Sequence, residues 1–129
     1  MYIFTLVDDV GRIIERLREQ HGEFTLAMLY NNALEAESSW NVIVSAPWTD
    51  AMGVAEATRL IARVLNESLG LENQRAISRI TVLRTSDPFV RDMTRLYAVR
   101  PGARVPLSQV TAGEVTEGSG FILYSQKVA

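Results

Sequence analysis

The chain has 129 residues, of which 47% are hydrophobic and 22% are charged, and its formal net charge is −2. This composition is typical of one folded domain and excludes an intrinsically disordered chain. The absence of cysteine excludes disulfides, thiolate metal sites and cysteine nucleophiles.

We predict a single domain over residues 1–129, because the sequence has no repeat, low-complexity tract or linker. The longest apolar runs are a few residues, whereas a bilayer-spanning helix needs roughly 20. The first residues carry Asp8 and Asp9 where a secretory signal needs a basic start. We therefore expect a cytoplasmic protein without a membrane segment.

Residues 6–20 have the apolar spacing of an amphipathic helix, with Gly22 as its C-terminal stop. The period then changes to two, which predicts a strand over 24–30 and a second strand over 40–46. The short polar connection between them favours an antiparallel hairpin.

A long helix follows over residues 50–69, capped by Thr49 or Asp50 and ended by Gly70. Residues 75–83 return to a strand pattern. Asp87 and Pro88 then suit the N-cap and first turn of a third helix that ends near Tyr97.

Prolines and glycines divide the remaining chain into short pieces, one of them an apolar strand over 121–124. The order of elements predicts an α+β fold of two layers, with helices packed on one face of a mixed β-sheet. One layer of helices leaves the second face of the sheet uncovered, and both faces of the hairpin strands carry large side chains. We therefore expect a homodimer, or a C-terminal segment folded over that face.

Strand 40–46, helix 50–69 and strand 75–83 form a crossover, which normally joins parallel strands. The loops 45–50 and 84–88 would then leave the same edge of the sheet, where α/β proteins bind ligands. Trp48, Asp50, Arg84 and Asp87 are the candidate residues for a small anionic ligand, with Trp48 shielding it and Arg84 pairing its charge. Capping and packing explain the same residue types without a ligand and are the simpler explanation.

Other chemistries find little support in the sequence. A Ser45, His21 and Asp50 triad lacks a nucleophile-elbow sequence, and no phosphate-binding glycine loop is present. We predict no metal and no cofactor. Arginines are concentrated between residues 75 and 104, but salt-bridged or solvated arginines explain them better than a nucleic-acid surface. These arginines are Arg75, Arg79, Arg84, Arg91, Arg95, Arg100 and Arg104.

The segments 40–48 (WNVIVSAPW) and 77–83 (ISRITVL), with DPFV at 87–90, resemble a group of small uncharacterised bacterial proteins of the kind carried by integron gene cassettes. The resemblance implies no catalytic residues. Our first hypothesis is thus an accessory or interaction protein, a homodimer that works through its surfaces and without catalysis. The alternative is an enzyme or binding protein for a small anionic ligand at the two loops.

Overall fold

The first helix follows the apolar stripe that the sequence predicts. In the computed structural model, which describes residues 3–31, 40–100, 105–107 and 119–126, α1 spans Ile3–His21. Leu6, Val10 and Leu17 along the stripe are fully buried. The helix stops at Gly22, whose φ of 124° lies in the region that favours glycine. The predicted stop is confirmed.

The next two strands form the predicted antiparallel pair. β1 spans Leu26–Asn31 and β2 spans Trp40–Ser45, with Met28 opposite Ile43. The connection over residues 32–39 lies outside the described residues. β3, Ile77–Val82, then pairs parallel to β2, so the predicted crossover is confirmed.

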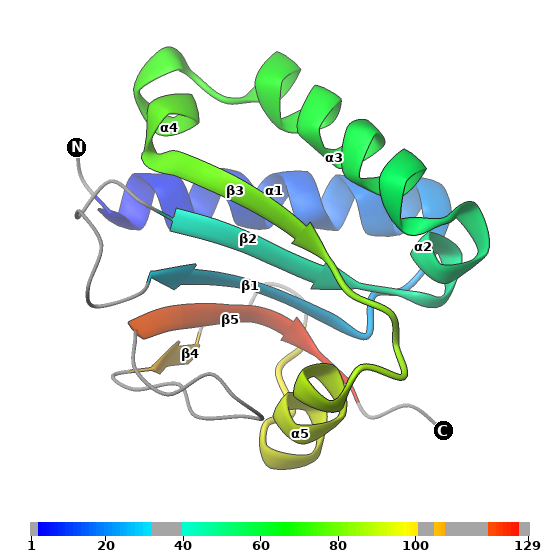
Figure 1. Cartoon of the computed structure of the whole chain (residues 1–129). Helices are drawn as coiled ribbons and strands as arrows, with labels where there is room; N and C mark the ends of the chain where they lie inside the picture. Colours follow the sequence, from blue (N-terminus) through cyan, green and yellow to red (C-terminus); the bar gives the residue numbers. More distant parts are fainter. Residues whose placement is uncertain (1–2, 32–39, 101–104, 108–118, 127–129) are drawn as a thin grey trace.

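The sheet is completed from the far end of the chain. β5, Ser119–Ser125, pairs antiparallel with β1, and β4, Val105–Leu107, pairs with β5. The order is β3-β2-β1-β5-β4, which puts β1 at the centre (Figure 1). β5 approaches β1 so closely that a Cβ atom at Gly120 would overlap the carbonyl oxygen of Leu29.

The predicted long helix over 50–69 is interrupted. α2 spans Pro47–Met52 and α3 spans Val54–Ser68, and between them Gly53 has a φ of 98° that ends one helix before the next begins. A further short helix, α4 (Leu71–Ala76), precedes β3. Arg75 therefore lies in α4, whereas the sequence pattern predicted it as the start of the strand over residues 75–83.

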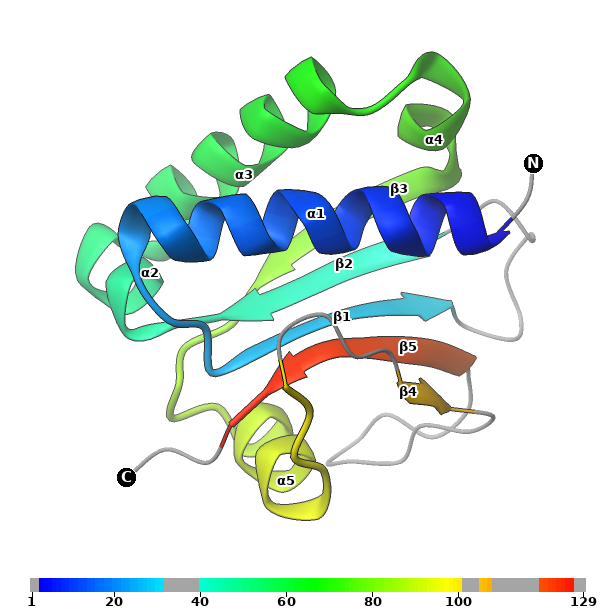
Figure 2. The ribbon, with the colours of Figure 1, turned by 180° about the vertical axis from the view of Figure 1, so that it is seen from behind.

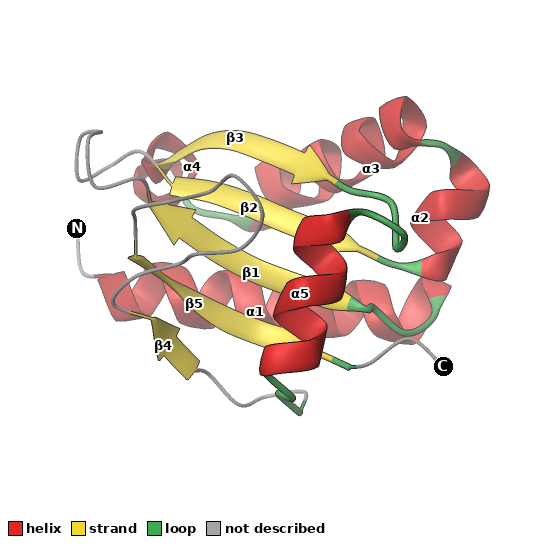
Figure 3. Ribbon diagram, turned by 60° about the horizontal axis from the view of Figure 1, so that its bottom comes forward, coloured by secondary structure: helices red, strands yellow, loops and turns green. Residues whose placement is uncertain are grey.

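The α+β fold on a mixed sheet is confirmed, and helices lie on both of its faces. α1 and α3 cover one face, with α2 and α4 at its margin (Figure 2). α5 (Pro88–Leu96) crosses the other face (Figure 3), where Phe89, Val90 and Met93 form a buried apolar stripe. These side chains pack with Leu26, Met28, Ile43 and Ile122 of the sheet.

The position of α5 answers the question of what covers the second face. We predicted helices on one face of the sheet and did not predict α5 on the other face. Periodicity shows that a helix is amphipathic, but it does not show where the helix packs. α5 buries much of the apolar surface that we expected a second copy of the chain to cover. No described helix combines the length and apolar character needed to cross a lipid bilayer.

Candidate functional site

The two loops that were predicted to converge do meet. Asp50 in the first turn of α2 accepts a hydrogen bond of 2.6 Å from the Thr85 hydroxyl. The Thr85 backbone N–H also donates to both carboxylate oxygens of Asp50, at 3.2 and 3.3 Å. The Asp50 carboxylate thereby joins α2 to the loop between β3 and α5.

The other two loop candidates have different surroundings. Asp87 caps α5, since its carboxylate accepts a hydrogen bond of 2.9 Å from the Phe89 backbone N–H. Arg84 is exposed, and within the described part of the chain its side chain has no hydrogen bond or ion pair. Arg84 is thus the one loop candidate whose charge is left to the solvent among the residues described.

Trp48 lies against the end of α1. Its ring stacks on His21 with centroids 4.8 Å apart and an interplanar angle of 21°. Its indole N–H donates to the Gly22 carbonyl at 3.1 Å, and its edge meets Phe24 at 5.4 Å between centroids. The structure therefore brings Asp50 to Thr85, while Trp48 packs against the turn that follows α1.

The structure does not bring together the candidate triad of Ser45, His21 and Asp50. The Ser45 hydroxyl is fully buried and has no hydrogen-bond partner in the described structure. His21 is engaged with Trp48, and Asp50 with Thr85. A buried hydroxyl without a base beside it cannot be activated as a nucleophile.

A charged cluster that sequence reasoning missed joins α1 to β5. The Tyr124 hydroxyl donates a hydrogen bond to the Glu23 carboxylate, and Arg18 donates to Glu23 at 2.7 Å. The hydrogen bond from Tyr124 holds the pKa of Glu23 below its usual range, and burial with the same contact raises the pKa of Tyr124 to about 12. No sequence signal could pair Glu23 with Tyr124, because they are 101 positions apart.

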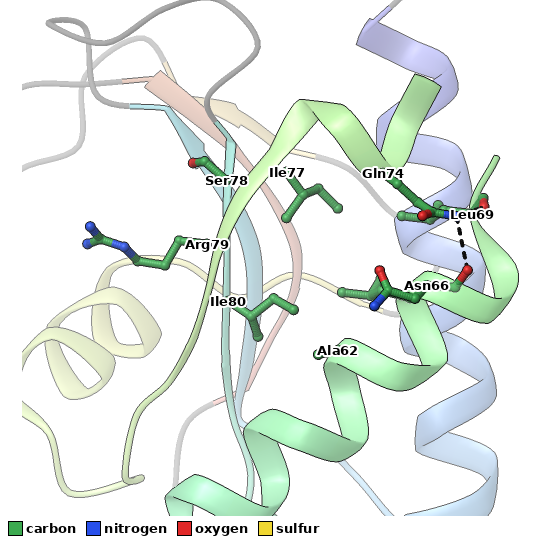
Figure 4. A pocket seen from close by; sticks show the side chains of 9 residues that line it. Ala62, Asn66, Leu69, Gln74, Ile77, Ser78, Arg79 and Ile80 are labelled. Carbon is green, nitrogen blue, oxygen red and sulfur yellow. Dashed lines mark hydrogen bonds between the residues drawn. The ribbon is translucent and has the colours of Figure 1, made fainter. Parts of the chain in front are cut away.

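A pocket of about 190 Å³ opens between α3 and β3 (Figure 4). Five apolar residues and four polar residues line it. Gln74 at its rim donates to the backbone carbonyls of Asn66 and Leu69, at 3.0 and 2.6 Å. The apolar lining is Ala62, Leu65, Leu69, Ile77 and Ile80, and the polar lining is Asn66, Gln74, Ser78 and Arg79.

An irregularity in β3 shapes this pocket. The register with β2 shifts so that Ile77 lies opposite Trp40 and Arg79 lies opposite Asn41, which leaves Ser78 as an extra residue. As a result Ile77 and Ile80, three positions apart, both point toward α3, whereas Arg79 points away from it (Figure 4). The bulge thus places apolar side chains on the α3 side and an arginine on the other.

β3 is also an edge strand, and among the described strands it pairs with β2 alone. The Leu83 backbone N–H donates to the Val44 carbonyl at 2.9 Å. Because backbone groups of successive residues point to opposite sides of a strand, those of Ile80 and Val82 point away from β2. Within the described ranges these groups have no backbone partner, and open backbone groups of this kind are a template for another strand.

Within the described ranges, no three His, Asp or Glu side chains gather in a way that could hold a metal ion. Comparison of the chain with models of protein families, with curated proteins and with solved structures found no match. The resemblance to cassette-borne bacterial proteins therefore stays a prediction.

Proposed function

We propose that this chain is a cytoplasmic interaction protein that binds another protein chain through the open edge of its sheet at β3. One observation carries the proposal: the backbone groups of Ile80 and Val82 point away from β2, directly beside a partly apolar pocket. Edge strands with free backbone groups bind extended segments by main-chain hydrogen bonding, and adjacent pockets supply selectivity.

A second copy of the chain is the first partner to consider. The second face of the sheet no longer requires a homodimer, because α5 packs against it. We therefore place the proposed dimer contact at β3, where two antiparallel copies can exchange hydrogen bonds. Pairing Ile80 with its own equivalent sets Arg79 opposite Thr81 and keeps the two arginines from facing each other directly.

Light scattering tests this dimer, with Ile80→Pro as the decisive variant. Proline at position 80 removes an N–H that points away from β2, so the β2–β3 ladder is preserved while the outer edge loses a donor. We expect the wild type at twice the 14.4 kDa chain mass, and the proline variant at the chain mass. Ile80→Val keeps the N–H and should remain dimeric. A wild type that is monomeric over the whole concentration range overturns the dimer.

We keep as a second proposal a small anionic ligand at the two converging loops. Its support is the exposed, unpaired Arg84 beside the Asp50–Thr85 contact. Inorganic phosphate is the probe, with binding measured by calorimetry. Arg84→Gln should abolish binding and Arg91→Gln, on α5, should not; equal binding by both variants removes the proposal.

A further inference from the structure

Two features at β3 lie side by side and would act on the same partner. One is the outer row of backbone groups, and the other is the pocket between β3 and α3. A strand added next to β3 would continue the sheet and direct alternate side chains toward the α3 side. Those side chains would stand beside Ile77 and Ile80, at the mouth of the pocket.

The size of the pocket favours one side chain over a free ligand. Its volume is about 190 Å³, whereas pockets that enclose drug-sized molecules measure roughly 300–1,000 Å³. The lining from Ala62, Leu65 and Ile77 suits an aliphatic group. The pocket therefore has a size and lining suited to one apolar side chain of a bound strand.

A second copy of β3 cannot supply that residue. The side chains that β3 directs toward α3 include Ile80 and Val82, and both pack in the core of their own chain, where Val82 is only 6% exposed. In a paired copy they would stay beneath the copy's own α3. A β3–β3 pairing thus uses the backbone groups and leaves the pocket empty.

The charge of Arg79 indicates which side chains would suit the positions next to the apolar anchor in the bound strand. Arg79 is exposed on the side of β3 away from α3, and within the described residues it forms no ion pair. β3 itself, with the sequence ISRITV, contains no acid. A residue next to the apolar anchor in the added strand would face this side, where a carboxylate complements Arg79.

We propose that β3 and its pocket bind an extended acidic peptide segment of another protein, as an additional strand of the sheet. The segment places an aliphatic side chain in the pocket and an Asp or Glu, one position away, beside Arg79. This inference rests on the proposed function at β3 and specifies the partner.

A labelled peptide of sequence Thr-Glu-Leu-Glu-Thr, acetylated and amidated, is the probe, with binding followed by fluorescence polarisation. Its leucine and glutamates fall on opposite sides of an extended strand. We expect saturable binding that Ile80→Pro abolishes. Ala62→Leu, which fills the pocket from α3, should weaken binding at least tenfold, and Arg79→Glu should weaken it about threefold, as for an exposed ion pair.

Two controls match these changes. Arg91→Glu makes the same charge reversal on α5 and should leave the affinity unchanged, and a peptide with alanine in place of leucine should bind like the Ala62→Leu variant. One outcome overturns the inference of an acidic peptide with an aliphatic anchor but leaves the edge proposal intact. In that outcome Ile80→Pro abolishes binding, whereas Ala62→Leu and Arg79→Glu leave the affinity unchanged. No peptide binding at protein concentrations at which the chain is monomeric, together with a dimer at higher concentration that Ile80→Pro dissociates, does the same. Peptide binding that is indifferent to Ile80→Pro overturns both.

Discussion

The phenol of Tyr124 connects two parts of the chain that are remote in sequence. It is buried at the end of β5, with 4% of its surface exposed, and donates to Glu23 in the turn after α1. Arg18 binds the same carboxylate and also Glu15, and these contacts raise the pKa of the Arg18 guanidinium above its ordinary value. The cluster holds the first helix to the last strand of the sheet.

Tyr124→Phe tests this connection. The variant keeps the buried ring and loses the hydroxyl, so we expect the free energy of unfolding to fall by about 1 kcal/mol. This is below the usual range for a hydrogen bond to a charged group, because Glu23 is exposed to water. Urea unfolding at pH 7 measures the change. Tyr97→Phe, at a half-buried tyrosine with no hydroxyl bond among the described residues, is the control. Equal stability of both variants would contradict a role for the contact.

The same pair gives the stability a defined pH dependence. The pKa of Tyr124 is raised from 10.0 to about 12, so its contribution is complete below pH 10 and is lost between pH 10 and about 12. The pKa of Glu23 is lowered, so its contribution is present above the usual value of 4.5 and is lost as the pH falls. The stability gap between wild type and Tyr124→Phe should therefore narrow at both ends of the pH range. A gap that stays constant up to pH 12 would refute the assignment.

Residue-level prediction from the sequence succeeded where the cause is local. Asp87 followed by Pro88 predicted a helix cap, and Asp87 does cap α5. Asp50 was predicted as a cap or a ligand residue, but its carboxylate reaches Thr85, 35 positions away. A side chain's own neighbours in sequence set a capping bond, whereas a contact of that separation depends on the finished fold.

At the level of elements, the Asp50–Thr85 contact fixes α2 against the β3–α5 loop. In this contact the half-buried Asp50 carboxylate accepts hydrogen bonds from the hydroxyl and from the backbone N–H of Thr85. It therefore sets where α5 begins its path across the second face of the sheet.

A double-mutant cycle measures this coupling. We expect Asp50→Ala to cost about 2 kcal/mol of unfolding free energy, because hydrogen bonds to a charged acceptor are among the stronger ones. Thr85→Val should cost less, and the double variant should show a coupling of about 1 kcal/mol. Asp92→Ala, which removes the exposed 3.4 Å pair with Arg95, is the control and should cost about 0.5 kcal/mol or less. Additive losses would show that the Asp50–Thr85 contact does not couple α2 to the β3–α5 loop.

Element boundaries show the limits of periodicity. Thr49 or Asp50 was predicted to cap one helix over residues 50–69, whereas both lie inside α2, and the backbone at Gly53 ends α2 and starts α3. α4 was not predicted, and its last residues, Arg75 and Ala76, were assigned to the following strand, because six residues are too few for a helical period to stand out.

At the scale of the whole molecule, the order of strands predicts how fast amide hydrogens exchange. β1 is the central strand, farthest from both edges of the sheet, and should be the slowest region. The amides of Thr81 in β3 and of Leu83 just after it point to β2 and should be protected, while those of Ile80 and Val82 should exchange quickly in the monomer. Exchange followed by NMR checks the alternation. Dilution of a β3-linked dimer should speed exchange at Ile80 and Val82 only, and slow exchange there at high dilution would mean that something else covers the edge.

The sequence predicted the class of fold, the β1–β2 pair and the crossover to β3, which are all set by periodicity and short connections. It did not predict that α5 lies on the second face or that β5 pairs with β1. Both depend on which apolar surfaces meet after the chain has folded. The pocket at β3 was not predicted because it depends on a one-residue bulge, for which the sequence has no recognisable pattern.

The pairing of β1 with β5 also bears on how the protein is made. Residues 26–31 emerge from the ribosome early, yet their second hydrogen-bonded neighbour, residues 119–125, is synthesised more than eighty positions later. Contacts of such long range slow folding, since a large loop must close before they form. During synthesis, the future centre of the sheet is thus an exposed edge that could pair with neighbouring nascent chains. Production of this chain should therefore depend on chaperones more than its small size suggests.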